Sequence, residues 1–434
     1  MKTRSHKKNI GIVSLGCAKN LVDSEQLMRQ LEGDDIHIHF DPSGISHFDI
    51  VIINTCGFIG DAKEESIDTI LQFAEARKTG KIGKLLVMGC LSQRYRQELA
   101  TDIPEVDGFF GVDEMSEVVK AAEGTFRKEL LGERHLTTPG HFAYLKIAEG
   151  CDRKCSFCAI PGIRGAHTSR TEEEIVREAE LLASKGVKEL LLISQDITYY
   201  GLDLYGKRRI AHLVKKLTQV KGIEWIRLHY AYPRGFPLDL LEVMRTEEKV
   251  CKYIDIPLQH INDRILRSMK RGLTGEKTRH LVDLIRERVP GVAIRTTFIV
   301  GYPGETEAEF EELKEFIRTS RFERVGVFTY SAEEGTSAFR LKDDLDQSVK
   351  EHRAEVLMQL QEEISLEKNQ HLIGQQINIL VDRKEGDHFT GRTEFDSPEV
   401  DNEVIIQPSG NKITPGRFYK ATITGATAYD LFAE

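Results

Sequence analysis

The chain has 434 residues, with 60 Lys and Arg against 69 Asp and Glu, which gives a net charge of −9 at pH 7. At roughly 100 to 200 residues per domain, this length predicts more than one domain. Apolar runs such as Leu85–Met88 are far shorter than the roughly 20 residues that cross a bilayer, which argues against a membrane span. The negative charge argues against binding of nucleic acid by overall charge, although it leaves room for a local basic groove.

The chain begins with a basic stretch, Met1–Lys8. No adequate apolar segment or small-residue cleavage site follows it, so we do not expect a secretory signal. The seven cysteines are therefore expected to be reduced, as in a cytoplasmic protein.

The first part of the chain alternates strand-like and helix-like segments. Strands are expected at Ile10–Leu15, Asp49–Asn54 and Lys84–Met88, and helices at Ser24–Leu31 and Lys63–Arg77. This alternation is typical of an open α/β unit with a mostly parallel sheet.

A cysteine beside a glycine follows each of these three strands: Cys17, Cys56 and Cys90. The carboxyl ends of strands in an open α/β sheet meet at one crevice, so the three thiols are expected to come together there as a cluster site. The glycines would permit close approach of the backbone. The alternative is that these are ordinary buried cysteines, although such residues should then fall within the strands.

From Phe142 onward the alternation repeats about six times, which predicts a partial (βα)6 barrel. The expected strands are Phe142–Ala148, Lys188–Ser194, Trp225–His229, Tyr253–Ile256, Val292–Val300 and Val325–Tyr330. The expected helices between them include Glu172–Ser184, Ala211–Val220, Lys277–Arg288 and Glu307–Thr319.

A CxxxCxxC run, Cys151, Cys155 and Cys158, follows the first barrel strand. This spacing allows one loop to bind three irons of a 4Fe-4S cube and to leave the fourth iron open to a substrate or cofactor. The alternatives are a zinc site or three unrelated thiols. Structural zinc usually takes four ligands, and the sequence has no partner CxxC or HxxxH motif downstream.

Polar residues also follow other barrel strands and would point into the same mouth. They are Ser194, Gln195 and Asp196 after the second strand, Gln259 and His260 after the fourth, and Gly301–Glu305 after the fifth. Each has a simpler interpretation, as a turn cap, a loop histidine or a tight connection. Cys251 matches no ligand spacing and is expected to be structural.

The last part of the chain predicts a long helix, Ser348–Leu372, and then a small antiparallel β-barrel. The expected barrel strands are Ile377–Val381, His388–Arg392, Val404–Ile406 and Phe418–Thr424. Residues 368–434 contain seven Lys and Arg against ten Asp and Glu. Such an acidic module suits a basic protein partner better than an RNA backbone, although the charge could also serve only solubility.

The run from Cys151 to Cys158, followed by Ile160-Pro161, Arg164-Gly165 and Ser169-Arg170, resembles the radical S-adenosylmethionine (SAM) enzymes, specifically the methylthiotransferases. The resemblance covers nearly the whole chain. It implies three domains: a methylthiotransferase domain with the three-cysteine cluster at 8–125, a radical-SAM domain at 137–367 and a TRAM domain at 368–434.

Two segments resemble one branch of these enzymes, Ser14–Glu25 and the acidic Gly391–Asn402. That branch implies addition of a methylthio group to the β-carbon of an aspartate in the twelfth protein of the small ribosomal subunit. The alternatives are the branch that modifies an adenosine of tRNA and a non-catalytic iron–sulfur scaffold or RNA-binding module. Contact with nucleic acid is compatible with the protein-modifying reading, but nucleic acid would not be the substrate.

The resemblance also implies the cofactors and their ligands. Two 4Fe-4S clusters would be held by Cys151, Cys155 and Cys158 and by Cys17, Cys56 and Cys90. SAM would bind near Phe157, Ser194, Gln195, Asp196 and Gln259. A flavodoxin-type or ferredoxin-type protein would donate electrons, and no catalytic base is assigned because hydrogen abstraction by a radical does not demand one.

Overall fold

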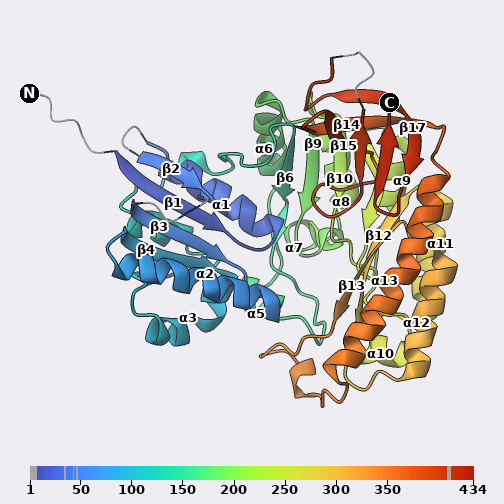
Figure 1. Cartoon of the computed structure of the whole chain (residues 1–434), viewed down its shortest axis with the longest axis horizontal. Coiled ribbons are helices and arrows are strands. Elements are labelled where there is room, and N and C mark those ends of the chain that lie inside the picture. Colours follow the sequence, from blue (N-terminus) through green and yellow to red (C-terminus); the bar gives the residue numbers. More distant parts are fainter. Residues whose placement is uncertain (1–6, 34–35, 43, 45–46, 408–411) are drawn as a thin grey trace, which may run out of the picture. The chain divides into compact units, whose positions relative to one another are not determined.

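The computed structural model describes residues 7–33, 36–42, 44, 47–407 and 412–434, so most of the basic start, Met1–His6, lies outside the described residues. The chain forms two compact units. Unit 1 comprises Met1–Thr137, Glu149–Arg153 and Cys158–Thr168, and unit 2 comprises Thr138–Ala148, Lys154–Phe157 and Ser169–Glu434 (Figure 1). In the described part of the chain, we find no helix with the length and apolar character needed to cross a membrane.

Unit 1 contains a five-stranded parallel sheet in the order β2-β1-β3-β4-β5. Its strands are β1 (Lys8–Ser14), β2 (Ile36–Phe40), β3 (Phe48–Thr55), β4 (Ile82–Gly89) and β5 (Gly108–Phe109). Its helices are α1 (Ala18–Leu31), α2 (Gly60–Lys78), α3 (Cys90–Asp102), α4 (Met115–Ala121), α5 (Ile160–Arg164) and the 3-10 turn η1 (Lys128–Leu130).

Helices cover both faces of this sheet. Leu27 and Met28 of α1 pack with Val118 of α4 on one face, and Ile70 of α2 packs near Leu99 of α3 on the other. The expected open parallel α/β architecture is confirmed. Strands β2 and β5 were not predicted because they are short edge strands whose residues are only partly buried.

Unit 2 begins with a six-stranded parallel sheet in the order β13-β12-β11-β10-β9-β6. Its strands are β6 (Phe142–Lys146), β9 (Glu189–Ile193), β10 (Trp225–Leu228), β11 (Val250–Asp255), β12 (Ala293–Val300) and β13 (Arg324–Thr329). The long connecting helices are α6 (Glu172–Ser184), α8 (Ile210–Thr218), α9 (Leu238–Thr246), α11 (Gly275–Arg288) and α12 (Glu307–Ser320). Strands β6 and β13 lie at the two edges, so the sheet is an open partial barrel, as expected.

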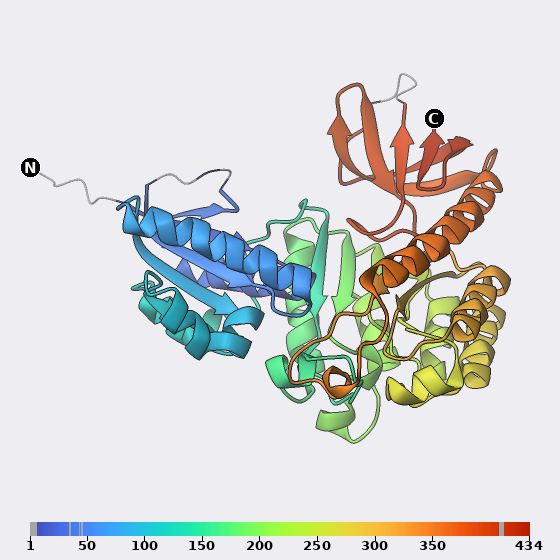
Figure 2. The same ribbon diagram turned by 60° about the horizontal axis from the view of Figure 1, so that its bottom comes forward.

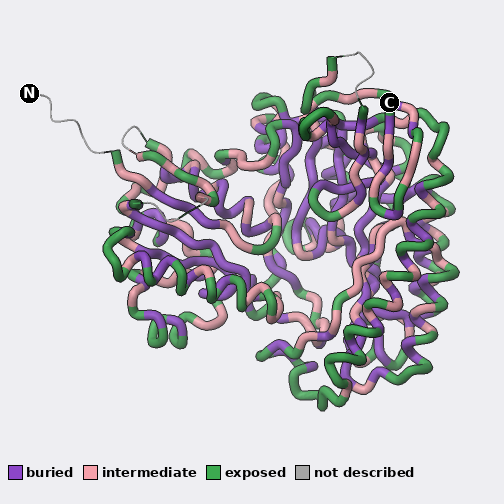
Figure 3. Tube along the Cα trace, viewed as in Figure 1, coloured by how far each residue is buried: buried purple, intermediate pink, exposed green. Residues whose placement is uncertain are grey.

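Shorter elements complete the connections. They are β7 (Ala148–Glu149), β8 (Thr168–Ser169), η2 (Ile197–Tyr199), α7 (Leu202–Tyr205), α10 (Asp263–Ser268) and η3 (Ala338–Arg340). The predicted starts of α6 and α12 agree with the structure because each helix carries a capping box, Thr171 with Glu174 and Thr306 with Glu309. Strands β9 and β10 are wholly buried, and Figure 3 shows how much of the chain in this region is buried, whereas the edge strand β13 is only partly buried.

The end of unit 2 is a helix followed by a small closed β-barrel (Figure 2). The helix is α13 (Gln347–Gln370), and the strands are β14 (Gln376–Glu385), β15 (His388–Arg392), β16 (Glu403–Ile406), β17 (Phe418–Ala426) and β18 (Asp430–Ala433). The barrel order is β14-β15-β16-β18-β17. The predicted antiparallel barrel is confirmed, except that β16 and the unpredicted β18 pair in parallel.

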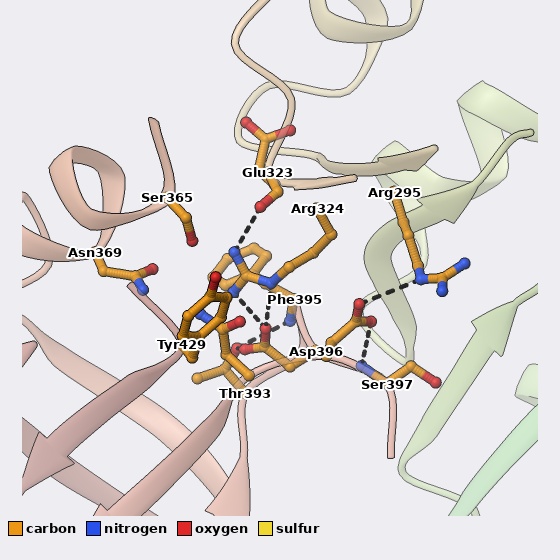
Figure 4. A network of polar contacts seen from close by, with 12 residues as sticks. Arg295, Glu323, Arg324, Ser365, Asn369, Thr393, Phe395, Asp396, Ser397 and Tyr429 are labelled. Atoms are coloured by element: carbon orange, nitrogen blue, oxygen red, sulfur yellow. Dashed lines mark hydrogen bonds and ion pairs between the residues drawn. The ribbon is translucent and has the colours of Figure 1, made fainter. Parts of the chain in front are cut away.

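The acidic segment between β15 and β16 is tied to the strands of the partial barrel (Figure 4). Arg324 Nε donates to Asp396 at 3.0 Å, and Asp401 accepts from Arg295 Nε at 3.3 Å and from the Tyr253 hydroxyl at 2.8 Å. Asp396 is 1 % exposed. These carboxylates are therefore structural partners of arginines and contribute little to an acidic surface for a partner protein.

Candidate metal centres

The sheet of unit 1 aligns the three N-terminal cysteines at the carboxyl ends of its strands. Cys17 is the N-cap residue of α1, Cys56 follows β3 and Cys90 begins α3 directly after β4. The register pairs Ser14 with Asn54 across β1 and β3, and Thr55 with Gly89 across β3 and β4. This pairing brings residues distant in sequence to the same edge of the sheet.

Two glycines permit the backbone at this edge to pack tightly. Gly16 has a φ of +87°, and a Cβ there would lie 2.6 Å from Cys56 Cβ. Gly89 has a φ of +101°, and a Cβ there would lie 2.4 Å from Asn54 Oδ1. Side chains do not fit at such distances, so both glycines are required by space as well as by backbone conformation.

Asn20 and Arg164 organise the surroundings of these thiols. The Asn20 amide donates to the carbonyls of Leu15 at 2.9 Å and Thr55 at 3.0 Å, which joins the ends of β1 and β3. Its Oδ1 accepts from Arg164 Nη2 at 2.6 Å and lies 3.8 Å from Cys90 Sγ. Arg164 therefore brings a buried positive charge to the thiol edge.

The thiols differ in their electrostatic environment. Burial raises the pKa of Cys56, and it raises the pKa of Cys90 to about 11 although Arg164 opposes this shift. Partial desolvation alone would raise the pKa of the exposed Cys17, but the charges of Lys19 and Arg164 lower it overall. A metal would have to displace protons from the two buried thiols, so its binding should release protons.

The donor set suits an iron–sulfur cluster, because thiolates are the soft ligands that such clusters take. Among the residues that the structure describes, no three His, Cys, Asp or Glu side chains are arranged to hold one metal ion. Three thiolates of a 4Fe-4S cube bind three separate irons and need not converge on one point. Soft thiolates next to a buried arginine also suit a cluster whose overall charge is negative.

The CxxxCxxC loop contributes to both units. In unit 1, the Cys151 N–H donates to the Gly165 carbonyl at 3.1 Å, and Cys151 Sγ accepts from the Arg153 N–H at 3.4 Å. Ala159 and Ile163, just after Cys158, pack against Cys90. Residues that flank the loop thus lie beside the first set of thiols.

In unit 2, Cys155 lies against an arginine and a tyrosine. Its Sγ accepts from Arg271 Nη1 at 3.3 Å and is 3.6 Å from the Tyr232 hydroxyl. The Arg271 guanidinium lies over the Tyr232 ring at 4.3 Å from the centroid and is buried. A thiolate at this position would receive a charge-assisted hydrogen bond.

Four of the predicted SAM-binding residues occupy buried or partly buried positions in unit 2. Ser194 Oγ accepts from the Asp196 N–H at 3.1 Å, and Asp196 Oδ1 caps the turn η2 by accepting from the Thr198 N–H at 2.9 Å. Gln195 lies between them in the same loop. Phe157 packs against a group that includes Met269. Asp196 therefore has the turn-capping role that was its simpler interpretation.

Gln259 has features that local structure does not require. Its φ is +75°, in a region that a glutamine rarely adopts, and its buried Oε1 has no hydrogen-bond partner among the described residues. The next residue, His260, is fully buried, and burial lowers its pKa to about 3. His260 Nδ1 accepts from the Asn262 N–H at 3.0 Å, so the ring is neutral.

The loop Gly301–Glu305 is a tight connection stabilised by its own glutamate. Glu305 accepts from the Tyr302 N–H at 3.1 Å and contacts Arg353 at 3.3 Å. Burial raises the pKa of Glu305 to about 7. Cys251 is buried and packs with Trp225, in agreement with a structural role.

Sequence reasoning assigned no role to Asn20, Arg271 or Tyr232. Asn20 lies three residues after Cys17, and this proximity was a usable signal for its role. Arg271 and Tyr232 reach Cys155 from loops that follow other strands. Nothing in the local sequence of those loops distinguishes them.

Three family models match the chain. The Radical SAM superfamily matches residues 145–317, the Uncharacterized protein family UPF0004 matches residues 9–111, and the TRAM domain matches residues 373–434. Radical SAM enzymes use SAM together with a 4Fe-4S cluster, so both are cofactors of this chain.

Solved structures support the fold. TsrM, a radical SAM methyltransferase from Kitasatospora setae with cobalamin and a [4Fe-4S] cluster bound, has a TM-score of 0.56 at 15% identity, covering 76% of this chain and 77% of its own. The cobalamin-dependent SAM radical enzyme OxsB has a TM-score of 0.52 at 12% identity, covering 81% of this chain and 56% of its own. At these identities the similarity establishes only the shared architecture.

Similar proteins extend over essentially the whole chain. The relatives from Christiangramia forsetii and Flavobacterium johnsoniae are 55% and 54% identical over 100% of this chain, and over 96% and 100% of their own lengths. A relative from Bacteroides thetaiotaomicron is 53% identical over 99% of this chain and 98% of its own. All three are named ribosomal protein uS12 methylthiotransferase RimO. With three matching family models and relatives of this identity along its full length, the chain belongs to the RimO family of radical SAM methylthiotransferases.

Proposed function

We propose that this protein adds a methylthio group to the β-carbon of an aspartate in ribosomal protein uS12. The observation that carries this proposal is similarity along essentially the full length to relatives of that name, with identities such as 55% and 51%. The two sets of three cysteines in this chain match the chemistry that such a reaction needs, because an unactivated carbon must first lose a hydrogen atom.

We assign the cluster that binds SAM to Cys151, Cys155 and Cys158, and the second cluster to Cys17, Cys56 and Cys90. When bound, the first cluster and SAM supply a carbon radical, and the second cluster supplies an open iron for the donated sulfur. Arg271 would hold a positive charge at the Cys155 sulfur, and Arg164 would do so near Cys90. Each arginine would balance the negative charge of the neighbouring cluster.

We assign SAM binding to the loops at the carboxyl ends of the barrel strands. Ser194, Gln195 and Asp196 would contact its methionine part, and Phe157 would lie near its adenine. Gln259 is the strongest of these candidates. Its backbone is strained, and its buried Oε1 has no hydrogen-bond partner among the described residues. A strained residue of this kind is typical of a ligand-binding position.

The remaining assignments follow from this chemistry. Residues 8–125 would form the methylthiotransferase domain, 137–367 the radical-SAM domain and 368–434 the TRAM domain. Electrons would come from a flavodoxin-type or ferredoxin-type protein. The reduced thiols and a ribosomal substrate indicate that the enzyme works in the cytoplasm.

The test is reconstitution of the enzyme without oxygen, with iron and sulfide, followed by reaction with SAM, a reductant and either uS12 or tRNA. We expect mass spectrometry to show one methylthio group on an aspartate of uS12 and no modified nucleoside in the tRNA. A modified adenosine together with unmodified uS12 would overturn the proposal in favour of the tRNA branch. SAM left intact by the reconstituted protein would favour a non-catalytic scaffold.

A further inference from the structure

A basic pocket of about 390 Å³ lies in unit 2 beside α10 and α11. Four cations line it, and the acidic residue among its lining is Asp263. The cations are Arg234, Arg267, Lys270 and Lys277, and all four are exposed. The pocket therefore concentrates positive charge on a protein whose net charge is −9.

Most of this charge is not used within the protein. In the described part of the chain, the side chains of Arg234, Arg267 and Lys277 have no hydrogen bond or ion pair, and Lys270 Nζ donates to the neutral Ser337 hydroxyl at 2.9 Å. Asp263 accepts from the Gly275 N–H at 2.6 Å, which occupies one of its oxygens. The four positive charges therefore face solvent, and they outnumber the acidic residues that line the pocket.

Two arginines that pack beside glycines extend the positive charge beyond the pocket. Arg234 lies across Gly272, where an added Cβ would be 2.6 Å from Arg234 Cδ. Arg208 lies beside Gly235, where an added Cβ would be 3.0 Å from Arg208 Nη2. A row of cations along a groove suits a ligand with several phosphates better than a single small anion.

The pocket belongs to the mouth of the partial barrel. Arg234 follows β10, and α10 and α11 follow β11, so these residues come after the carboxyl ends of the strands. Gly272 of the pocket is next to Arg271, the residue that donates to Cys155 Sγ. A macromolecule bound in the pocket would therefore be close to the reaction.

We propose that this basic pocket binds the RNA backbone of the small ribosomal subunit while uS12 is modified. The inference rests on the proposed function, since uS12 can present RNA to the enzyme only as part of a ribosomal particle. A basic pocket would repel a basic ribosomal protein, so its complement is the RNA that such proteins bind. The enzyme would thereby recognise uS12 in its RNA-bound form in preference to the free protein.

The test compares the reconstituted wild-type enzyme with Arg234→Gln/Arg267→Gln. The matched control, Lys221→Gln/Arg288→Gln, removes two exposed cations that precede β10 and β12 and so lie at the opposite ends of the barrel strands. Binding to small ribosomal subunits with unmodified uS12 and to their isolated RNA is measured across a series of salt concentrations. Modification of a free uS12 peptide is measured in parallel.

We expect the pocket variant to bind both RNA-containing ligands at least about tenfold more weakly, with a log–log salt slope shallower by roughly 1 to 2. Its kcat/KM for the free peptide should stay within about twofold of wild type, and the control should match wild type throughout. Equal binding by wild type and variant, or an equal loss in the control, would overturn the proposal. A loss of kcat/KM on the free peptide would instead assign the pocket to the protein substrate. Failure of all three enzymes to modify the peptide would count against the proposed function, independently of the RNA measurement.

Discussion

The two sets of three cysteines are built in opposite ways. Cys17, Cys56 and Cys90 come from three separate strand ends and depend on the register of a parallel sheet. Cys151, Cys155 and Cys158 occupy a single loop, so chain length alone limits their separation. Changes in the sheet should therefore disable the first set and leave the second intact.

Each set of cysteines also has one neighbouring arginine, and the two arginines are held by different contacts. Burial opposes the charge of Arg164, but Asp23 and Glu149 raise its pKa overall, with ion pairs at 3.3 and 2.9 Å. Arg271 stacks on Tyr232 and donates directly to a cysteine sulfur. The two clusters should consequently respond differently to the loss of their arginines.

The largest effect is expected from Gly16→Ala. The new Cβ would lie 2.6 Å from Cys56 Cβ at a φ of +87°, so the end of β1 would have to move. We expect loss of about half the bound iron and no methylthio product, with SAM cleavage preserved. Gly162→Ala is the control, because a Cβ there meets nothing within 4 Å. Normal iron content and activity in Gly16→Ala would contradict the tight packing of this edge.

A change remote from both sets should affect stability alone. Asp396→Asn removes the buried carboxylate that pairs with the partly buried Arg324 and should lower the free energy of unfolding by about 3 kcal/mol. Denaturant unfolding measures this loss, with the exposed Asp387→Asn as control. Iron content of the reconstituted variant should equal that of wild type. A loss of iron from either set would mean that the acidic segment also supports a cluster.

The two arginines can be compared by redox titration. Arg271→Gln should lower the reduction potential of the cluster at Cys155 by about 50 mV, because a positive hydrogen-bond donor at a ligand sulfur favours the reduced form. Arg164→Gln should change the reduction potential of the cluster at Cys17, Cys56 and Cys90. Lys154→Gln, an exposed cation in the cysteine loop, serves as control. Unchanged potentials in Arg271→Gln would show that this contact does not influence the cluster.

A smaller effect is expected from His260, which should make the folding stability depend on pH. The unfolded chain protonates His260 near its ordinary pKa of 6.5, whereas the folded protein does so only near 3, so stability should fall as the pH drops below 6.5. Between pH 7.5 and 5.5, the wild type should lose about 1 kcal/mol more than His260→Asn. Urea unfolding at the two pH values measures the difference. A parallel loss in both proteins would exclude His260 as the cause.

Much of the fold was predictable because periodicity and capping are local. The start and end of α6 and of β15 agree with the predicted Glu172–Ser184 and His388–Arg392. The edge strand β5 was missed because it has only two residues and depends on tertiary pairing, whereas β2 carries a period-2 alternation that the prediction overlooked. The acidic residues of the last module were expected to suit a basic protein partner, and only the structure shows that Asp396 and Asp401 pair with arginines of the barrel strands.

The candidate site was predictable to the extent that its residues carry distinctive chemistry. Cysteines after strands stand out in the sequence, and the parallel sheet explains why Cys17, Cys56 and Cys90 meet. The contacts of Arg271 and Tyr232 with Cys155 join loops after different strands, and no local pattern encodes them. The strained backbone of Gln259 is likewise visible only in three dimensions.

The division of labour between the two clusters is the central claim, and one measurement tests it most directly. Wild type, Cys155→Ala and Cys56→Ala are reconstituted, and SAM cleavage and methylthio product are measured in the same reaction. Wild type should give both, Cys155→Ala neither, and Cys56→Ala cleavage without product. Cleavage by Cys155→Ala at the wild-type rate, or methylthio product from Cys56→Ala, would contradict the account.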